Sequence, residues 1–183
     1  MKNKIPVKIK EFTSPSGLKQ KGVMLAVNDY LGLGENVQEK VKDFEKKYFE
    51  LVKKAQKIMP KNKGKRKSST LWKIGKLLYD FNKSIKNEFE ITNYSSAIVR
   101  DFELSGQRSV RYILDFGEFF TESDISDLVP FSHYMILIDQ KNLVGKSSFQ
   151  KEKNRLVEMA KNGTLPQRDK YRSEFKKLEK TTN

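Results

Sequence analysis

Apolar residues between positions 35 and 59 recur at alternating steps of four and three, and no other feature of the sequence constrains the fold as much. This spacing places the apolar side chains on one face of an α-helix, whereas a strand would need a period of two. We therefore predict one long amphipathic helix over residues 35–60. Its apolar face consists of Val37, Val41, Phe44, Tyr48, Leu51, Ala55 and Ile58.

The apolar face of this helix has two alternative roles. The pattern covers about three heptads, which is short for a coiled coil. The helix either lies on the core of its own domain or pairs with another helix, in the same chain or in a homodimer. In the homodimer, the seven apolar residues above would be the dimerisation contacts.

The remaining sequence predicts further helices and an irregular N-terminus. Residues 71–90 repeat the three-and-four spacing, and so do residues 147–161 and 165–180. Asn162 and Gly163 mark the end of one of these helices. The predicted fold class is all-α, a multi-helix domain containing a helix-turn-helix-like unit. The predicted parts are an arm or small β-hairpin over 1–34, the helix over 35–60, a linker over 61–69 and the helical domain over 70–183, with no strand after the arm.

Positive charge is concentrated in two segments of the chain, and the formal net charge is +14. Residues 1–67 contain 18 Lys and Arg against 7 Asp and Glu, and residues 141–183 contain 12 against 5. Residues 68–140 contain 7 against 11. A positive excess of this size favours polyanions, because neutralising phosphates releases condensed counterions. The segregation therefore favours nucleic-acid binding, although many lysine-rich chains are basic only for solubility.

The densest basic cluster follows Pro60, which ends the first predicted helix. Gly64 and repulsion between like charges make this segment a linker, either solvated or in contact with phosphates. Ser68, Ser69 and Thr70 come next and are candidate N-caps of the following helix.

The segment from Tyr94 to Phe120 has the layout of a helix-turn-helix unit. Apolar residues follow helical spacing on both sides of a short break, "ELSG". In such a unit the N-terminal part of the second helix enters the major groove of DNA. Ala97 is small enough for a close helix crossing, and Gly106 tolerates a positive φ in the turn. The alternative is an ordinary helical hairpin within a core.

The start of the second helix carries side chains suited to reading bases. Gln and Arg make bidentate contacts with base edges, whereas Lys, Arg and Ser contact phosphates. The predicted base contacts are Gln107, Arg108, Arg111 and Tyr112. The predicted phosphate contacts are Lys61, Lys63, Lys65, Arg66, Lys67, Ser105, Ser109, Arg168, Lys170, Arg172, Lys176 and Lys177.

The order of these elements resembles the N-terminal helical domain of YhcG-like proteins over about residues 70–180. The matches are Trp72, Ile74 and Gly75 ("W.IG"), several positions within 107–116, and the "SHY" of 132–134. The start of the second helix is also similar, more weakly, to the helix-turn-helix of ParB/KorB-type partition proteins. The resemblance implies a helical, DNA-binding module.

One feature of that family is not expected here. YhcG-like proteins carry a C-terminal nuclease domain of the PD-(D/E)XK type, and the present sequence ends at Asn183, before such a domain could begin. The family's Arg-Asn pair is Arg108-Ser109 in this chain, so a contact made by that Asn does not carry over.

The sequence contains no motif of catalytic or metal chemistry that we could assign. It has no cysteine, and His133 is the only histidine. Because His133 stands beside an apolar run, we expect it to be a hydrogen-bonded structural residue. The glycines of "GLGENVQEKV" and "LVGKSS" lack the remaining residues of a phosphate-binding loop. We therefore predict no catalytic residue, no metal ligand and no cofactor.

These observations predict a non-catalytic protein that binds double-stranded DNA, with a homodimer as an option. The alternative is a protein–protein adaptor or mobile-element accessory factor that uses residues 1–59 as its partner surface, and the acidic balance of residues 68–140 favours it. No apolar run approaches the roughly 20 residues of a membrane span. The N-terminus lacks the apolar stretch of a signal peptide, so we expect a cytoplasmic protein without membrane contact, associated with the nucleoid if it binds DNA.

Overall fold

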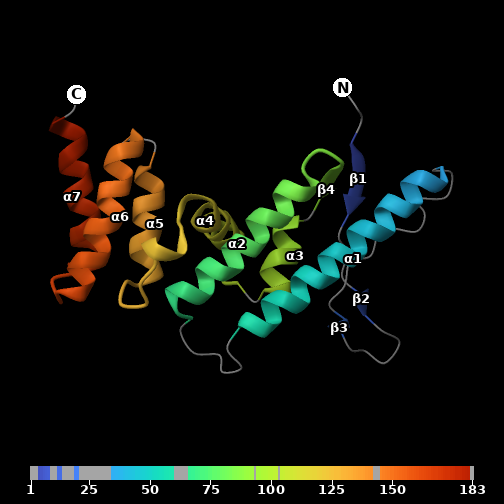
Figure 1. Ribbon diagram of the computed structural model, residues 1–183, viewed down its shortest axis with the longest axis horizontal. Coiled ribbons are helices and arrows are strands. Elements are labelled where there is room, and N and C mark those ends of the chain that lie inside the picture. The colour runs from blue at the N-terminus through green and yellow to red at the C-terminus, as the bar shows by residue number, and fades with distance from the viewer. Residues whose placement is uncertain are drawn as a thin grey trace. The chain divides into compact units, whose positions relative to one another are not determined.

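Helices dominate the computed structural model, which describes residues 4–8, 12–13, 19–20, 34–59, 66–92, 94–102, 104–141 and 145–181 (Figure 1). This confirms the predicted class, an all-α multi-helix fold. The helices are α1 (Glu35–Ile58), α2 (Ser68–Ile85), α3 (Tyr94–Asp101), α4 (Gln107–Phe119), the 3-10 turn η2 (Glu122–Asp124), α5 (Phe131–Gln140), α6 (Gly145–Lys161) and α7 (Arg168–Thr181).

In the described part of the chain, four short strands accompany the helices. β1 (Ile5–Lys8) pairs in parallel with β4 (Phe89–Thr92), and β2 (Phe12–Thr13) pairs antiparallel with β3 (Lys19–Gln20). The prediction that a helix continues to residue 90, with no strand after the arm, is therefore wrong. The helix ends at Ile85, residues 86–88 are exposed, and in β4 the buried Phe89 is followed by the exposed Glu90 and the half-buried Ile91, as the alternation of a strand requires.

The chain forms two compact units. Residues Met1–Met59 and Leu77–Arg111 form the first, and residues Pro60–Lys76 and Tyr112–Asn183 form the second. α2 and α4 therefore each contribute to both units. The predicted boundaries, a linker over 61–69 and a single domain over 70–183, differ from this division because residues 77–111 group with the N-terminal segment.

Aromatic packing on α1 forms the core of the first unit. The Phe44 ring lies 5.9 Å from the Phe81 ring and 5.1 Å from the Phe89 ring, and the Tyr48 ring lies 5.9 Å from Phe81. Phe44 and Tyr48 are at most 1% exposed. The helix thus takes the first of its two predicted roles, since its apolar face covers the core of its own chain.

This burial removes the face of α1 that was predicted to form a dimer. Five of the seven residues proposed as dimerisation contacts are buried, and the two at the ends of the set, Val37 and Ile58, are half-buried. A side chain that fills the core of its own chain has no surface to offer a second copy. The buried residues of the predicted interface are Val41, Phe44, Tyr48, Leu51 and Ala55.

In the second unit α2 and α4 touch through their backbones. A Cβ atom built on Gly75 would lie 2.1 Å from the carbonyl oxygen of Ile113, and one built on Gly117 would lie 2.1 Å from the carbonyl carbon of Gly75. Only glycine fits at this crossing. Beside it the Phe116 ring packs against Phe120 at 5.0 Å and Tyr134 at 4.8 Å.

Of two further glycines with a predicted role, Gly106 differs from its prediction and Gly163 agrees with it. Gly106 does not adopt a positive φ, and nothing lies within 4 Å of a Cβ built on it. Gly163 does adopt a positive φ, of 67°, and it follows the end of α6 as its sequence position predicted. Ala97 is buried.

Replacing Gly117 with Ala should destabilise the protein by about 1–3 kcal/mol or more, because the new methyl group would overlap a backbone that cannot rotate away. This cost exceeds the gain of about 1 kcal/mol that Ala has over Gly in a helix. Urea unfolding measures the change. The matched control is Gly106→Ala, which has open space and should stay within about 0.5 kcal/mol of the wild type. Equal stability of both variants would contradict the close crossing.

Candidate nucleic-acid interface

The α3–α4 segment contains the predicted pair of helices joined by a short turn. α3 ends at Asp101 and α4 begins at Gln107. Along α4, Val110, Ile113 and Phe116 are at most 2% exposed. These positions anchor one side of the helix in the protein interior.

Three of the four predicted base-contacting residues are exposed at the start of α4. They are Gln107, Arg108 and Arg111. The Gln107 Nε2 donates a hydrogen bond of 3.0 Å to the Ser96 Oγ on α3, so this side chain is oriented across the two helices. Its amide oxygen and the two guanidinium groups supply the acceptor and donors that base edges require.

Tyr112, the fourth predicted base contact, is buried. It is 1% exposed, and its hydroxyl donates to the carboxylate of Asp139 on α5, with distances of 2.8 Å to both oxygens. The prediction is wrong because α4 packs against α5 as well as α2, which widens its buried face to include position 112.

The predicted phosphate contacts are divided between the two units. Ser105 and Ser109 hydrogen-bond to each other, with 2.7 Å between their Oγ atoms. Lys67 lies in the other unit and is 3.8 Å from the Asp127 Oδ2. In that same unit Arg66 and Arg172 are half-buried, and Arg168 and Lys170 are exposed in the first turn of α7. Lys61, Lys63 and Lys65, and the side chains of Lys176 and Lys177, lie outside the described residues.

The N-terminus of α2 is capped from a distant part of the chain. The backbone N–H of Ser69 donates 2.9 Å to the Asp127 carboxylate, and the Ser68 hydroxyl donates 2.6 Å to the Val129 carbonyl. Ser68 is therefore used in a tertiary contact rather than as the local cap that its sequence position suggested. Burial opposes ionisation of Asp127, but the Ser69 donors and the charges of Lys67 and Lys73 outweigh it and lower the pKa of Asp127.

A buried carboxylate joins α3 to α1. Asp101 is 1% exposed, and its Oδ2 accepts a hydrogen bond of 2.7 Å from the Tyr48 hydroxyl. The Arg100 guanidinium donates to the same carboxylate at 2.6 and 3.0 Å. Burial and the neighbouring carboxylate raise the pKa of Tyr48, so its hydroxyl remains a donor. This contact fixes the last turn of α3, immediately before the turn that leads to α4.

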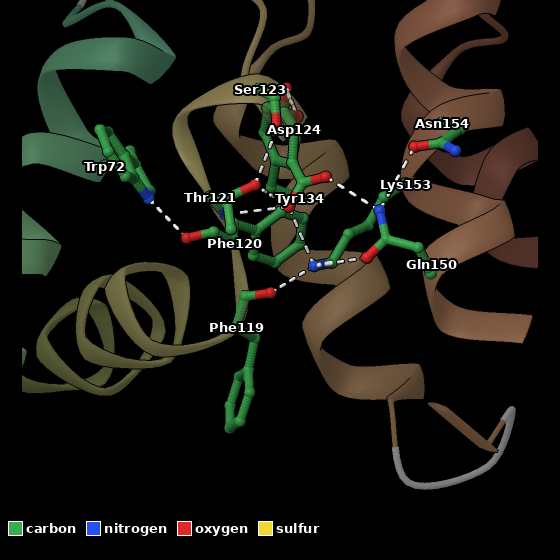
Figure 2. A network of polar contacts seen from close by, with 10 residues as sticks. All are labelled: Trp72, Phe119, Phe120, Thr121, Ser123, Asp124, Tyr134, Gln150, Lys153 and Asn154. Carbon is green, nitrogen blue, oxygen red and sulfur yellow. Dashed lines mark hydrogen bonds and ion pairs between the residues drawn. The ribbon is translucent and has the colours of Figure 1, made fainter. Parts of the chain in front are cut away.

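A second buried network holds the C-terminal end of α4 (Figure 2). The Lys153 ammonium, 5% exposed, lies 3.0 Å from the Asp124 Oδ2 and also donates to the carbonyl oxygen of Phe119. The Trp72 indole N–H donates 2.9 Å to the carbonyl of Phe120. Carbonyls at a helix end have no partner within the helix, so Lys153 and Trp72 satisfy groups that α4 leaves open.

The Asp124 carboxylate accepts hydrogen bonds from three residues of this network. The backbone N–H of Thr121 donates at 2.8 Å, the Gln150 amide at 3.0 Å and Lys153 at 3.0 Å. Burial opposes ionisation, but these hydrogen bonds outweigh it and lower the pKa of Asp124. No local sequence pattern predicts this network, because its hydrogen bonds join residues up to 48 positions apart.

His133 is hydrogen-bonded, as expected from its position beside an apolar run. Its Nε2 donates to the Pro166 carbonyl at 2.9 Å, and its ring lies 5.4 Å from the Tyr171 ring. Its imidazole thus links α5 to the segment that precedes α7.

Comparisons with known proteins add no relative to this description. No protein-family model, no curated protein and no solved structure matches the chain. The likeness to YhcG-like proteins therefore stays a prediction. Within the described ranges, no helix is both long enough and apolar enough to cross a membrane.

Replacing Lys153 with Met should destabilise the protein by about 3–5 kcal/mol, because Asp124 would remain buried without its cation. Denaturant unfolding measures the loss. Arg155→Met is the matched control on the same helix. Arg155 pairs with Glu152 and Glu174 near the surface, so its loss should cost about 1 kcal/mol or less. If the two variants lose the same free energy of unfolding, the buried Lys153–Asp124 pair contributes no more to stability than the surface pairs of Arg155.

The Asp124 carboxylate should make the protein sensitive to acid. Its pKa is lower in the folded state than in the unfolded state, so the unfolded state binds the proton more tightly. The stabilisation is present above the unfolded pKa and is lost as pH falls through the folded pKa. In Asp124→Asn, the free energy of unfolding should fall less steeply between pH 6 and pH 3. Parallel pH profiles for the two proteins would show that another group governs acid sensitivity.

Proposed function

We propose that the protein is a non-catalytic, double-stranded DNA-binding protein and that the first turns of α4 read the major groove. One observation carries this proposal. Gln107, Arg108 and Arg111 are exposed together at the start of a helix whose other side is anchored by Val110 and Ile113. A rigid helix with donors on its outer side is the arrangement that major-groove readout uses.

Three further features support the proposal. The N-terminal end of α4 carries the positive end of the helix dipole, which favours a nearby phosphate. The Tyr48–Asp101 contact fixes α3 against α1, so the helix that precedes α4 is braced by a buried hydrogen bond. The net charge of +14 supplies a non-specific attraction to the DNA backbone.

A homodimer through the apolar face of α1 is not part of this proposal, because that face is buried within its own chain. A single helix-turn-helix-like unit would then contact one half-site. The selected DNA should accordingly contain one short conserved segment rather than two repeats one helical turn apart.

The double variant Arg108→Ala/Arg111→Ala should lose sequence-specific binding and keep weak, salt-sensitive binding. Each good bidentate base contact contributes about 1–3 kcal/mol of discrimination. The measurement starts with selection of a binding site from a random duplex library. Fluorescence anisotropy on that duplex and on a scrambled one then gives the ratio of affinities at two salt concentrations.

The matched control is Lys83→Ala/Lys86→Ala, which removes the same charge from exposed positions of the same unit. It should weaken binding to both duplexes equally and leave the ratio of the two affinities unchanged. If the arginine variant keeps the wild-type ratio, α4 does not read the DNA. If the wild type selects no duplex and ignores DNA at low salt, the adaptor alternative takes its place.

A further inference from the structure

The face of α1 that points away from the core carries four lysines around one exposed phenylalanine. These residues are spaced by four, three, four and four positions, which places them in a single stripe along the helix. All five are exposed, and the Phe49 side chain is 42% exposed. The stripe consists of Lys42, Lys46, Phe49, Lys53 and Lys57.

Exposed carboxylates stand three or four positions from three of these four lysines on the same helix, namely Glu39, Asp43 and Glu50. None of the four lysines forms an ion pair with a described carboxylate, whereas the neighbouring Lys47 lies 2.6 Å from the Asp43 Oδ2. Lys42 and Lys46 stand four positions apart, as do Lys53 and Lys57, and like charges at this spacing destabilise a helix. The four ammonium groups therefore face solvent, where the phosphates of a polyanion can reach them.

Phe49 indicates which polyanion fits. Single exposed apolar residues are common on protein surfaces. Here, however, the ring lies between cations on both sides along the helix, with Lys46 and Lys53 separated by roughly 10 Å of helix axis. Proteins that bind single-stranded nucleic acid combine lysines along the backbone with aromatic rings on which bases stack. In a duplex the base faces are stacked inside the helix, so an exposed ring has nothing to stack on.

We propose that this face of α1 binds single-stranded DNA, with the lysines neutralising phosphates and Phe49 stacking on an unpaired base. The stripe spans roughly 22 Å, enough for several nucleotides. Binding of a single strand by α1 does not depend on α4. Only the choice of DNA over RNA rests on the proposed function.

The test compares Phe49→Ala and Lys46→Gln/Lys53→Gln with the wild type in the full chain. Fluorescence anisotropy follows binding to a 20-nucleotide single-stranded DNA, the same sequence as RNA, and the corresponding duplex DNA. Phe49→Ala should weaken single-strand binding by about 5- to 150-fold, the effect of losing one stacked base. It should change duplex binding less than twofold. Because Phe49 is exposed, the Phe49→Ala variant should have the same thermal unfolding midpoint as the wild type.

The matched control for the lysine variant is Lys83→Gln/Lys86→Gln, which removes two exposed charges from the same unit outside the stripe. The stripe variant should bind the single strand at least fivefold more weakly than this control. Wild-type single-strand affinity in Phe49→Ala, equal losses on single strand and duplex, or no single-strand binding by the wild type at low salt would each overturn the proposal. Tighter binding of RNA than of DNA would overturn the choice of DNA.

The outcomes separate this inference from the function proposed for α4. Arg108→Ala/Arg111→Ala should alter duplex discrimination and leave single-strand binding within twofold. If Arg108→Ala/Arg111→Ala leaves duplex discrimination unchanged and Phe49→Ala weakens single-strand binding, the α1 surface is supported and the role of α4 is not. If only the arginine variant has its expected effect, the role of α4 is supported and the α1 surface is not.

Discussion

The backbone contact between Gly75 and Gly117 is the constraint on which the second unit depends. Side chains normally hold two packed helices apart, so contact at backbone distance requires that both helices lack a Cβ at the crossing. Once α2 and α4 meet there, Trp72 on α2 can reach the carbonyl of Phe120 just beyond α4. The same crossing places Phe116 in the aromatic cluster with Phe120 and Tyr134.

Two buried polar contacts then define where the central helices end. Asp101 holds the last turn of α3 to α1 through Tyr48, and Lys153 holds the last carbonyls of α4 through the network around Asp124. A buried charge is tolerated only with a partner and further hydrogen bonds. Each network meets this condition and therefore specifies one arrangement of its helices within its own unit.

The sequence predicted the helices better than their contacts. Apolar spacing located α1 and the α3–α4 break within a few residues, because both follow the helical period. It misassigned residues 86–90 as helix, although the helix ends at Ile85 and β4 begins at Phe89. It also placed Tyr112 on the outside, because spacing along one helix does not show that two neighbours cover it. The partners of Asp101 and Asp124 lie 53 and 29 positions away, beyond any local pattern.

The distribution of charge along the chain also differs from its distribution on the surface. Residues 68–140 have a formal charge of −4, which seemed to disfavour a DNA-reading helix within them. Yet Asp124 is buried against Lys153 and Asp127 lies near Lys67, and both of these cations lie outside the segment. Part of the negative charge in this segment is thus neutralised by ion pairs within the protein. The cations at the start of α4 and along α1 are exposed, so the segment sum overstates the repulsion that DNA would meet.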